Sequence, residues 1–202
     1  MKTRRLAALL GARCSVLGAA CSAPGALVLG LGLSTAALAK VDAGAQQKSP
    51  GAGPVVVLET VKGTIEFETY PDEAPKTVER VVELVKKNFY NGQRFHRAEP
   101  KFVVQIGDPQ SRLPQMIEHW GRSGFGKPIG VSEITKKRRH LRGAVAMAHT
   151  GDPSEASSQF YITLANRPDL DGKYTVFGRV ITGMAVADRL EKGDMLKRAS
   201  VK

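Results

Sequence analysis

Cysteine is almost absent from this chain, and its distribution limits the kinds of protein that the sequence can form. The 202 residues include only Cys14 and Cys21, and both lie near the N-terminus. The rest of the chain therefore contains no disulfide framework. Such an absence of thiols suits an oxidising compartment without proving one. The length predicts a single domain with an appended segment.

Acidic residues are missing from the first 39 positions, whereas four basic residues occur there, namely Lys2, Arg4, Arg5 and Arg13. The whole chain has 30 Lys and Arg against 19 Asp and Glu, a net charge of +11. Without the first 39 residues the excess is 26 minus 19, or +7. An excess of this size mostly favours solubility and weak attraction to anionic surfaces.

Aromatic residues make up only 6% of the chain, which bears on the basic run Lys136–His140. This run has too few aromatic neighbours for a nucleic-acid platform, so we interpret it as a solvated face and expect no nucleic-acid partner. The competing hypothesis is a basic domain that binds nucleic acid through residues 136–139. It predicts binding that weakens steeply with salt.

Motifs for metals, nucleotides and nucleophilic catalysis are also lacking. The four histidines, at positions 96, 119, 140 and 149, show no metal-ligand spacing, so we expect no metal and no cofactor. Residues 121–127 fit G-x-x-x-x-G-K, but Pro128 stands where a phosphate-binding loop needs Ser or Thr, which favours a surface loop. No G-x-S-x-G elbow is present. A catalytic Ser-His-Asp triad assembled from residues far apart in the sequence is an alternative that this absence does not exclude.

Residues 1–39 have the pattern of an export signal. The segment starts with basic residues, carries no charge from Cys14 to Ala39, and ends in Ala37-Leu38-Ala39, an A-x-A cleavage site. We therefore predict an exported, periplasmic protein. The alternative is an uncleaved membrane anchor, because a run this long can span a bilayer. The Gly and Ala content and Pro24 favour cleavage.

The remaining chain divides into a flexible linker over residues 40–54, rich in Gly, Pro, Gln and Ser, and a globular body from Val55. Alternation and apolar runs predict strands over residues 55–60, 64–70, 102–106, 144–148, 159–164, 173–181 and 195–201. Glu66 and Glu68 alternate with apolar residues and predict one wet face of a hairpin. Helices are predicted from Pro75 to Lys87 and over residues 183–192. Residues 108–130 are rich in turn formers and are expected to form an irregular loop on the surface. Many short strands with two helices indicate an antiparallel barrel or sandwich.

One stretch, Phe95–Asp108, combines a charged residue with a core strand. The apolar run Phe102–Ile106 reads as buried, and Arg97 and Gln105 are expected at either end of this strand pair. Arg and Gln are rarely buried without a partner, so their position beside a buried strand indicates either a functional role or a partly exposed side chain. The simpler interpretation is a surface arginine whose stem lies over the hydrophobic edge.

Five blocks of sequence, taken in order, resemble the cyclophilins in their bacterial form. They are Phe95-His96-Arg97, Phe102 to Gln105 with Gly107-Asp108, Arg142 to Ala148, Ser158 to Ile162, and Leu170 to Val180. The resemblance covers residues 55–202. It implies a mainly β fold, a closed eight-stranded antiparallel β-barrel capped by two α-helices, and activity as a peptidyl-prolyl cis-trans isomerase. We also expect the protein to be a monomer.

The resemblance assigns the site residue by residue. Arg97 matches the catalytic arginine of the family. The positions expected to bind the proline-containing polypeptide are Phe102, Val103, Gln105, Ala148, His149, Gln159, Tyr161, Leu170 and Tyr174. Of these, Gln105 is expected to steady Arg97 as well.

Four positions depart from the best-known eukaryotic pattern. Tyr161 replaces a phenylalanine of the pocket, so its hydroxyl must be tolerated or hydrogen-bonded at the floor of the slot. Asp169 stands where many members have a tryptophan, Tyr174 replaces a histidine and His149 an asparagine. These changes bear on cyclosporin binding more than on catalysis.

The sequence thus predicts an exported isomerase that acts on unfolded or extended polypeptides, where slow proline steps limit folding. The alternative is a peptide-binding or chaperone module of the same fold, in which Tyr161 weakens catalysis. Binding of an Ala-Pro peptide without faster cis-trans exchange would favour that alternative.

Overall fold

The computed structural model describes Ser49 and residues 51–202. The predictions made for residues 1–39, the export signal with its cleavage site or the membrane anchor, lie outside this part of the chain, as does most of the linker. No helix among the described residues combines the length and hydropathy needed to cross a bilayer.

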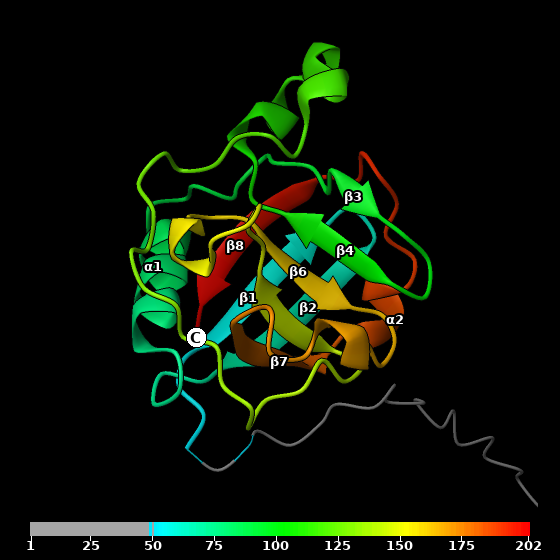
Figure 1. Cartoon of the computed structure of the whole chain (residues 1–202). Helices are drawn as coiled ribbons and strands as arrows, with labels where there is room; N and C mark the ends of the chain where they lie inside the picture. Colours follow the sequence, from blue (N-terminus) through cyan, green and yellow to red (C-terminus); the bar gives the residue numbers. More distant parts are fainter. Residues whose placement is uncertain (1–48, 50) are drawn as a thin grey trace, which may run out of the picture. The chain divides into compact units, whose positions relative to one another are not determined.

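Eight antiparallel strands form one sheet that curls on itself, with a helix at each side (Figure 1). The strands lie in the order β3-β4-β6-β5-β7-β2-β1-β8. Their bounds are β1 Val55–Thr60, β2 Gly63–Thr69, β3 Arg97–Ala98, β4 Val103–Ile106, β5 Ala144–Met147, β6 Phe160–Thr163, β7 Val176–Thr182 and β8 Leu196–Val201. The predicted mainly β architecture with eight antiparallel strands and two helices is therefore confirmed.

The sheet is a curled half-barrel rather than the closed barrel that was expected. Among the described strands, no ladder joins the edges β3 and β8. The segment before β3 instead meets the start of β8 and the residues before it through one isolated antiparallel bridge, Arg94 with Met195, and through flanking backbone bonds such as Phe95 N to Asp194 O at 2.9 Å. Because β3 has only two residues, it is too short to continue a ladder across this gap.

The hairpin β1–β2 turns at the predicted position, with Thr60 paired to Gly63. Ile65 and Phe67 are fully buried in the core, as their alternation predicts. Glu68 was expected on a wet face but is also fully buried. Its carboxylate accepts hydrogen bonds from the Ser49 backbone nitrogen and hydroxyl, both at 2.6 Å, which compensate its burial.

The long helix α1 (Pro75–Lys86) begins at the predicted proline and packs beside β8. Its buried positions include Val78, Val81 and Val85, which recur at helical spacing and face the main core. The second helix, α2 (Met184–Ala187), lies beside β2 and is much shorter than expected. The chain after it is held by Lys62, whose ammonium contacts the Arg189 carbonyl at 2.6 Å and the Asp194 carboxylate at 2.9 Å.

Four short 3₁₀ turns complete the fold: η1 Pro109–Arg112, η2 Pro114–His119, η3 Pro153–Glu155 and η4 Pro168–Leu170. The first two belong to the excursion over residues 108–130, which extends beyond the sheet (Figure 1). Asp108 anchors this excursion, since its buried carboxylate accepts from Gln110 N at 2.8 Å and Gly121 N at 2.6 Å. The excursion is thus tied to the end of β4.

Candidate active site

Arg97 and Gln105 lie directly opposite each other in the β3–β4 pair. The prediction that they lie at either end of the pair was wrong, because β3 spans only Arg97 and Ala98. In an antiparallel pair, opposite residues project to the same face. The two polar side chains therefore share one side of the sheet.

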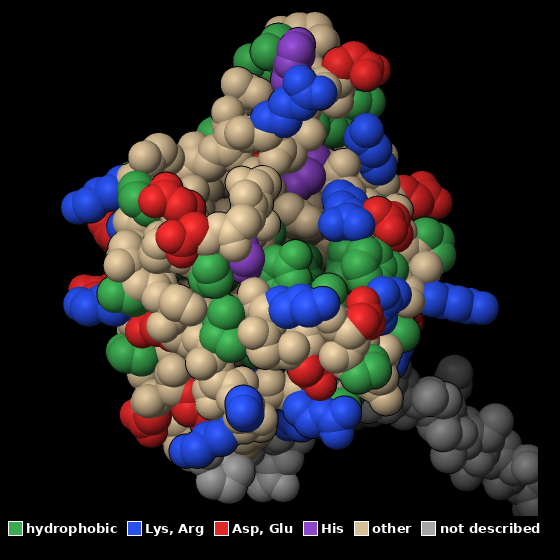
Figure 2. Space-filling model, viewed as in Figure 1, with side chains coloured by type: hydrophobic (Ala, Val, Ile, Leu, Met, Phe, Trp, Pro, Cys, Tyr) green, Lys and Arg blue, Asp and Glu red, His purple; other side chains and the backbone are tan. Residues whose placement is uncertain are grey.

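That side of the sheet carries a hollow of about 200 Å³. Its lining consists of Arg97, Phe102, Val103, Gln105, Ala148, His149, Thr150, Tyr161, Leu170 and Tyr174. Nine of the ten residues singled out in the sequence are in this lining, and Thr150 is the addition. Figure 2 shows apolar side chains gathered near the centre of this face, with Lys and Arg around them. We call this hollow the slot.

Gln159 is the predicted residue that does not line the slot. Its amide oxygen accepts from the Gln105 amide at 2.8 Å, and its amide nitrogen donates to Gly121 O at 3.0 Å and Ser123 O at 2.6 Å. Gln159 therefore links Gln105 to the excursion. Within the described chain no hydrogen bond joins Gln105 to Arg97.

The Arg97 side chain is 45% exposed at the lip of the slot. Its Nε donates to the Glu99 carboxylate at 2.6 Å, and its guanidinium carbon lies 5.0 Å from the centre of the Phe102 ring. We find no other hydrogen bond to this guanidinium in the described part of the chain, so its two terminal nitrogens are open to a ligand. Sequence reasoning missed Glu99 as a partner of Arg97.

A second arginine lies against Phe102. The guanidinium carbon of Arg167 is 4.0 Å from the ring centre, and Asp169 binds that guanidinium at 2.9 and 2.8 Å. Asp169, which was noted in the sequence as a departure from the family tryptophan, is thus the partner of Arg167. No motif in the sequence marked Arg167, because its role depends on the fold of the turn η4.

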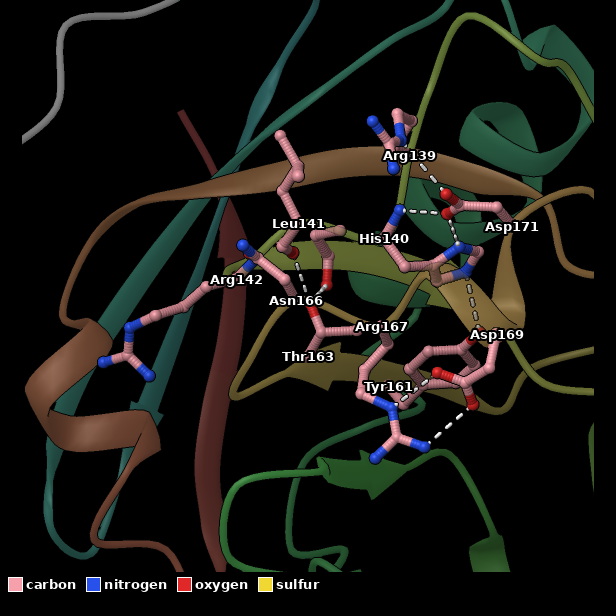
Figure 3. Close-up of polar contacts among 11 residues, drawn as sticks. Arg139, His140, Leu141, Arg142, Tyr161, Thr163, Asn166, Arg167, Asp169 and Asp171 are labelled. Atoms are coloured by element: carbon pink, nitrogen blue, oxygen red, sulfur yellow. Dashed lines mark hydrogen bonds and ion pairs between the residues drawn. The ribbon is translucent and has the colours of Figure 1, made fainter.

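The floor of the slot contains a buried polar connection (Figure 3). The Tyr161 hydroxyl lies 3.0 Å from His140 Nε2, and His140 Nδ1 lies 3.1 Å from the Asp171 carboxylate. Burial raises the pKa of Tyr161. Burial also lowers the pKa of His140, and this outweighs the opposing effect of Asp171. The hydroxyl that the sequence analysis expected at this floor is therefore hydrogen-bonded.

The basic run at 136–140 is not a uniform solvated face, contrary to its sequence interpretation. His140 is buried. Arg138 binds Glu73 through two nitrogens at 2.6 and 2.9 Å, and its guanidinium carbon lies 3.7 Å from the centre of the Tyr70 ring. These two side chains are fixed by partners more than 20 residues away in the sequence.

His149 and Tyr174 also line the slot, and their ring centres are 4.6 Å apart. The His149 ring nitrogen Nε2 lies 3.0 Å from the Lys173 carbonyl. Nearby, Ala148 N donates to Gln159 O at 2.9 Å. No group of three His, Cys, Asp or Glu side chains in the described part of the chain is placed to hold a metal ion.

An apolar slot with polar groups aimed into it is the usual form of a ligand site. Here such a slot lies on a curled antiparallel sheet with an arginine at its lip, which defines a candidate ligand site. Residues 55–202 match the family described as cyclophilin type peptidyl-prolyl cis-trans isomerase. The chain belongs to this family, and its function is that of an isomerase.

Individual relatives agree with this assignment. The chain is 35% identical over 175 residues to a probable peptidyl-prolyl cis-trans isomerase of Brucella abortus, which covers 84% of this chain and 89% of that protein. It is 41% identical over 137 residues to the human peptidyl-prolyl cis-trans isomerase-like 3, and this match covers 68% of this chain and 81% of the human protein. A cyclophilin type isomerase of Cryptosporidium parvum has a similar fold, with a TM-score of 0.64, 24% identity, and coverage of 74% of this chain and 97% of that one.

Proposed function

We propose that Arg97 is the catalytic residue of this isomerase and that the slot holds the proline ring of an extended polypeptide. The observation that carries the proposal is the position of Arg97 at the lip of a hollow that Phe102, Tyr161 and Leu170 also line, with its terminal nitrogens open. Proline is the residue whose preceding bond is slow to rotate, in tens to hundreds of seconds.

The chemistry follows from the electronic structure of the imide. Donation of the nitrogen lone pair into the carbonyl maintains a rotation barrier of about 18–20 kcal/mol. In the twisted state this lone pair is localised on the nitrogen, where a guanidinium can hydrogen-bond to it. Arg97 then stabilises the twisted state more than the planar ones, which lowers the barrier. The step needs no nucleophile and no change of covalent bonds.

The other slot residues hold the substrate in this proposal. Phe102, Tyr161 and Leu170 contact the proline ring, while Gln105 and the backbone near Ala148 bind the neighbouring peptide groups. In support, the Cryptosporidium parvum cyclophilin with a similar fold has also been crystallised in the presence of the dipeptide Ala-Pro. We propose proline-containing polypeptides as the substrates of this chain as well.

The experiment is NMR exchange spectroscopy on an Ala-Pro peptide with catalytic amounts of enzyme. Wild type is expected to accelerate cis-trans exchange. Arg97→Ala is expected to lose about a hundredfold of that acceleration, the effect of removing one donor to a developing charge. Thermal unfolding of the same sample checks that the variant is folded. A folded Arg97→Ala that kept the full rate would overturn the role of Arg97.

We also propose that the enzyme acts outside the cytoplasm, in the periplasm if the host is a bacterium with two membranes. The basic start, the uncharged run and the A-x-A site of residues 1–39 support this. N-terminal sequencing of the protein purified from the exporting cell is expected to begin at Lys40. A protein that kept Met1 and sedimented with membranes would instead show an anchor.

The alternative of a peptide-binding module without catalysis rested on the Tyr161 hydroxyl. That hydroxyl is hydrogen-bonded to His140, which does not line the slot. In the proposal, the substrate therefore meets the aromatic ring of Tyr161 rather than its hydroxyl. We therefore retain the isomerase as the proposed activity of the slot itself.

A further inference from the structure

Tyr161 lines the slot, and its hydroxyl is bound by a residue that does not line the slot. Its partner is His140 Nε2 at 3.0 Å, and His140 is absent from the lining. Both residues are buried, at 5% and 1% exposure. Figure 3 shows a dashed line between the His140 imidazole and Tyr161.

Asp171 fixes which ring nitrogen of His140 carries the proton. Its Oδ1 accepts from the His140 backbone nitrogen at 2.7 Å and lies 3.1 Å from Nδ1. An ionised carboxylate can only accept, so Nδ1 is the protonated nitrogen. Nε2 of the neutral ring is then an acceptor, and the Tyr161 hydroxyl donates to it.

Burial favours the neutral form of the imidazole at pH 7, against the carboxylates that face it. Asp171 and Asp169 face it from the η4 segment, Tyr161 from β6, Tyr174 from the chain before β7, and Arg139 precedes it in the sequence. Burial lowers the pKa of His140, and the carboxylates of Asp171 and Asp169 oppose this only in part. The imidazole therefore stays available as an acceptor.

We propose that His140 and Asp171 are positioning residues of the isomerase, which hold the Tyr161 hydroxyl outside the slot so that proline meets only the aromatic ring. The inference rests on the proposed function of the slot. Without His140, the buried hydroxyl has no acceptor and turns toward the slot or draws water to it. A proline ring then has to displace a polar group, which weakens substrate binding.

The test compares four proteins: wild type, His140→Leu, Tyr161→Phe and the double variant. In the tyrosine background, His140→Leu is expected to raise KM for an Ala-Pro peptide about tenfold, the effect of one unpaired buried polar group, and to change kcat less than threefold. In the phenylalanine background, the same substitution is expected to change KM less than twofold, because no hydroxyl remains to be held. This is a rescue that general structural damage does not produce. Equal losses in both backgrounds would overturn the inference.

A second measurement needs no variant and keeps the inference testable if His140→Leu does not fold. In ¹⁵N NMR spectra of the wild-type imidazole at pH 7, the expected tautomer has Nδ1 protonated and Nε2 bare. The opposite tautomer would overturn the inference. Wild type that failed to accelerate exchange at all would instead overturn the proposed function, so the two failures are distinguishable.

Discussion

Gly107 is the residue whose replacement tests how closely the site strands approach each other. It follows β4 directly and has a φ of +116°. A Cβ at this position would lie 2.3 Å from the Ser158 carbonyl oxygen and 2.5 Å from the Gln159 Cα. Both are backbone atoms, so β4 and β6 would have to separate where Gln105 and Gln159 meet.

The expected cost of Gly107→Ala has two parts. The left-handed backbone costs a residue with a Cβ about 1–3 kcal/mol. Over-packing against the backbone of residues 158–159 adds about 1–3 kcal/mol. The sum, about 2–6 kcal/mol, is a large share of the 5–15 kcal/mol that is typical of a domain. We therefore expect a clear loss of stability.

Urea unfolding measures this loss, and Gly151→Ala is the matched control. Gly151 has a similar φ of +128°, but a Cβ there meets nothing within 4 Å. Gly151→Ala is thus expected to lose only the backbone part, about 1–3 kcal/mol. The difference between the two variants isolates the contact. Equal losses would refute the argument that β4 and β6 approach too closely for a side chain.

Two further predictions concern a buried histidine and a partly exposed ion pair. Burial lowers the pKa of His96 to about 4 from the ordinary 6.5, with Asp108 opposing it in part. Between pH 6.5 and pH 4, His96 is protonated in the unfolded chain but neutral in the folded one. The free energy of unfolding therefore falls by about 3 kcal/mol as the pH drops from above 6.5 to 4. In urea titrations at several pH values, His96→Leu should lack this part of the slope, and an unchanged slope would count against the assignment. Arg138→Lys, which loses the two-nitrogen contact with Glu73, should cost about 1–2 kcal/mol. Arg139→Lys, at a side chain 64% exposed, should cost less than about 0.5 kcal/mol, and equal losses would contradict the prediction.

The elements that depend on neighbouring residues could be predicted from the sequence. The turn at Lys62-Gly63, the helix start at Pro75 and the apolar strand over residues 103–106 are all present. Each is determined by local propensity and by the spacing of apolar side chains. The two-residue strand β3 could not be predicted in this way, and with it the opposite placement of Arg97 and Gln105 was missed.

The polar residues whose partners are distant could not be predicted. Glu68 reads as solvent-facing from its alternation, yet Ser49, 19 residues away, makes its burial possible. His140 reads as part of a charged run, yet Asp171, 31 residues away, holds it in the core. No local pattern carries these pairings, because they exist only once the sheet has brought the segments together.

The candidate site shows the same limit. Their position beside an apolar run marked Arg97 and Gln105 as unusual, whereas the other site residues came from the resemblance to a family. The structure then placed nine of the ten around one slot. It also added Glu99, Arg167 and His140, which contact the slot residues but belong to no motif.

The central claim is that Arg97 stabilises the twisted imide and contributes little to binding of the planar one. The most direct test separates the two on Arg97→Ala, with NMR titration giving peptide affinity and exchange spectroscopy giving the rate on the enzyme. We predict a rate lowered about a hundredfold and an affinity changed by less than about fivefold, since exposed charged contacts contribute less than about 1 kcal/mol. A hundredfold loss of affinity with an unchanged rate on the enzyme would contradict the claim.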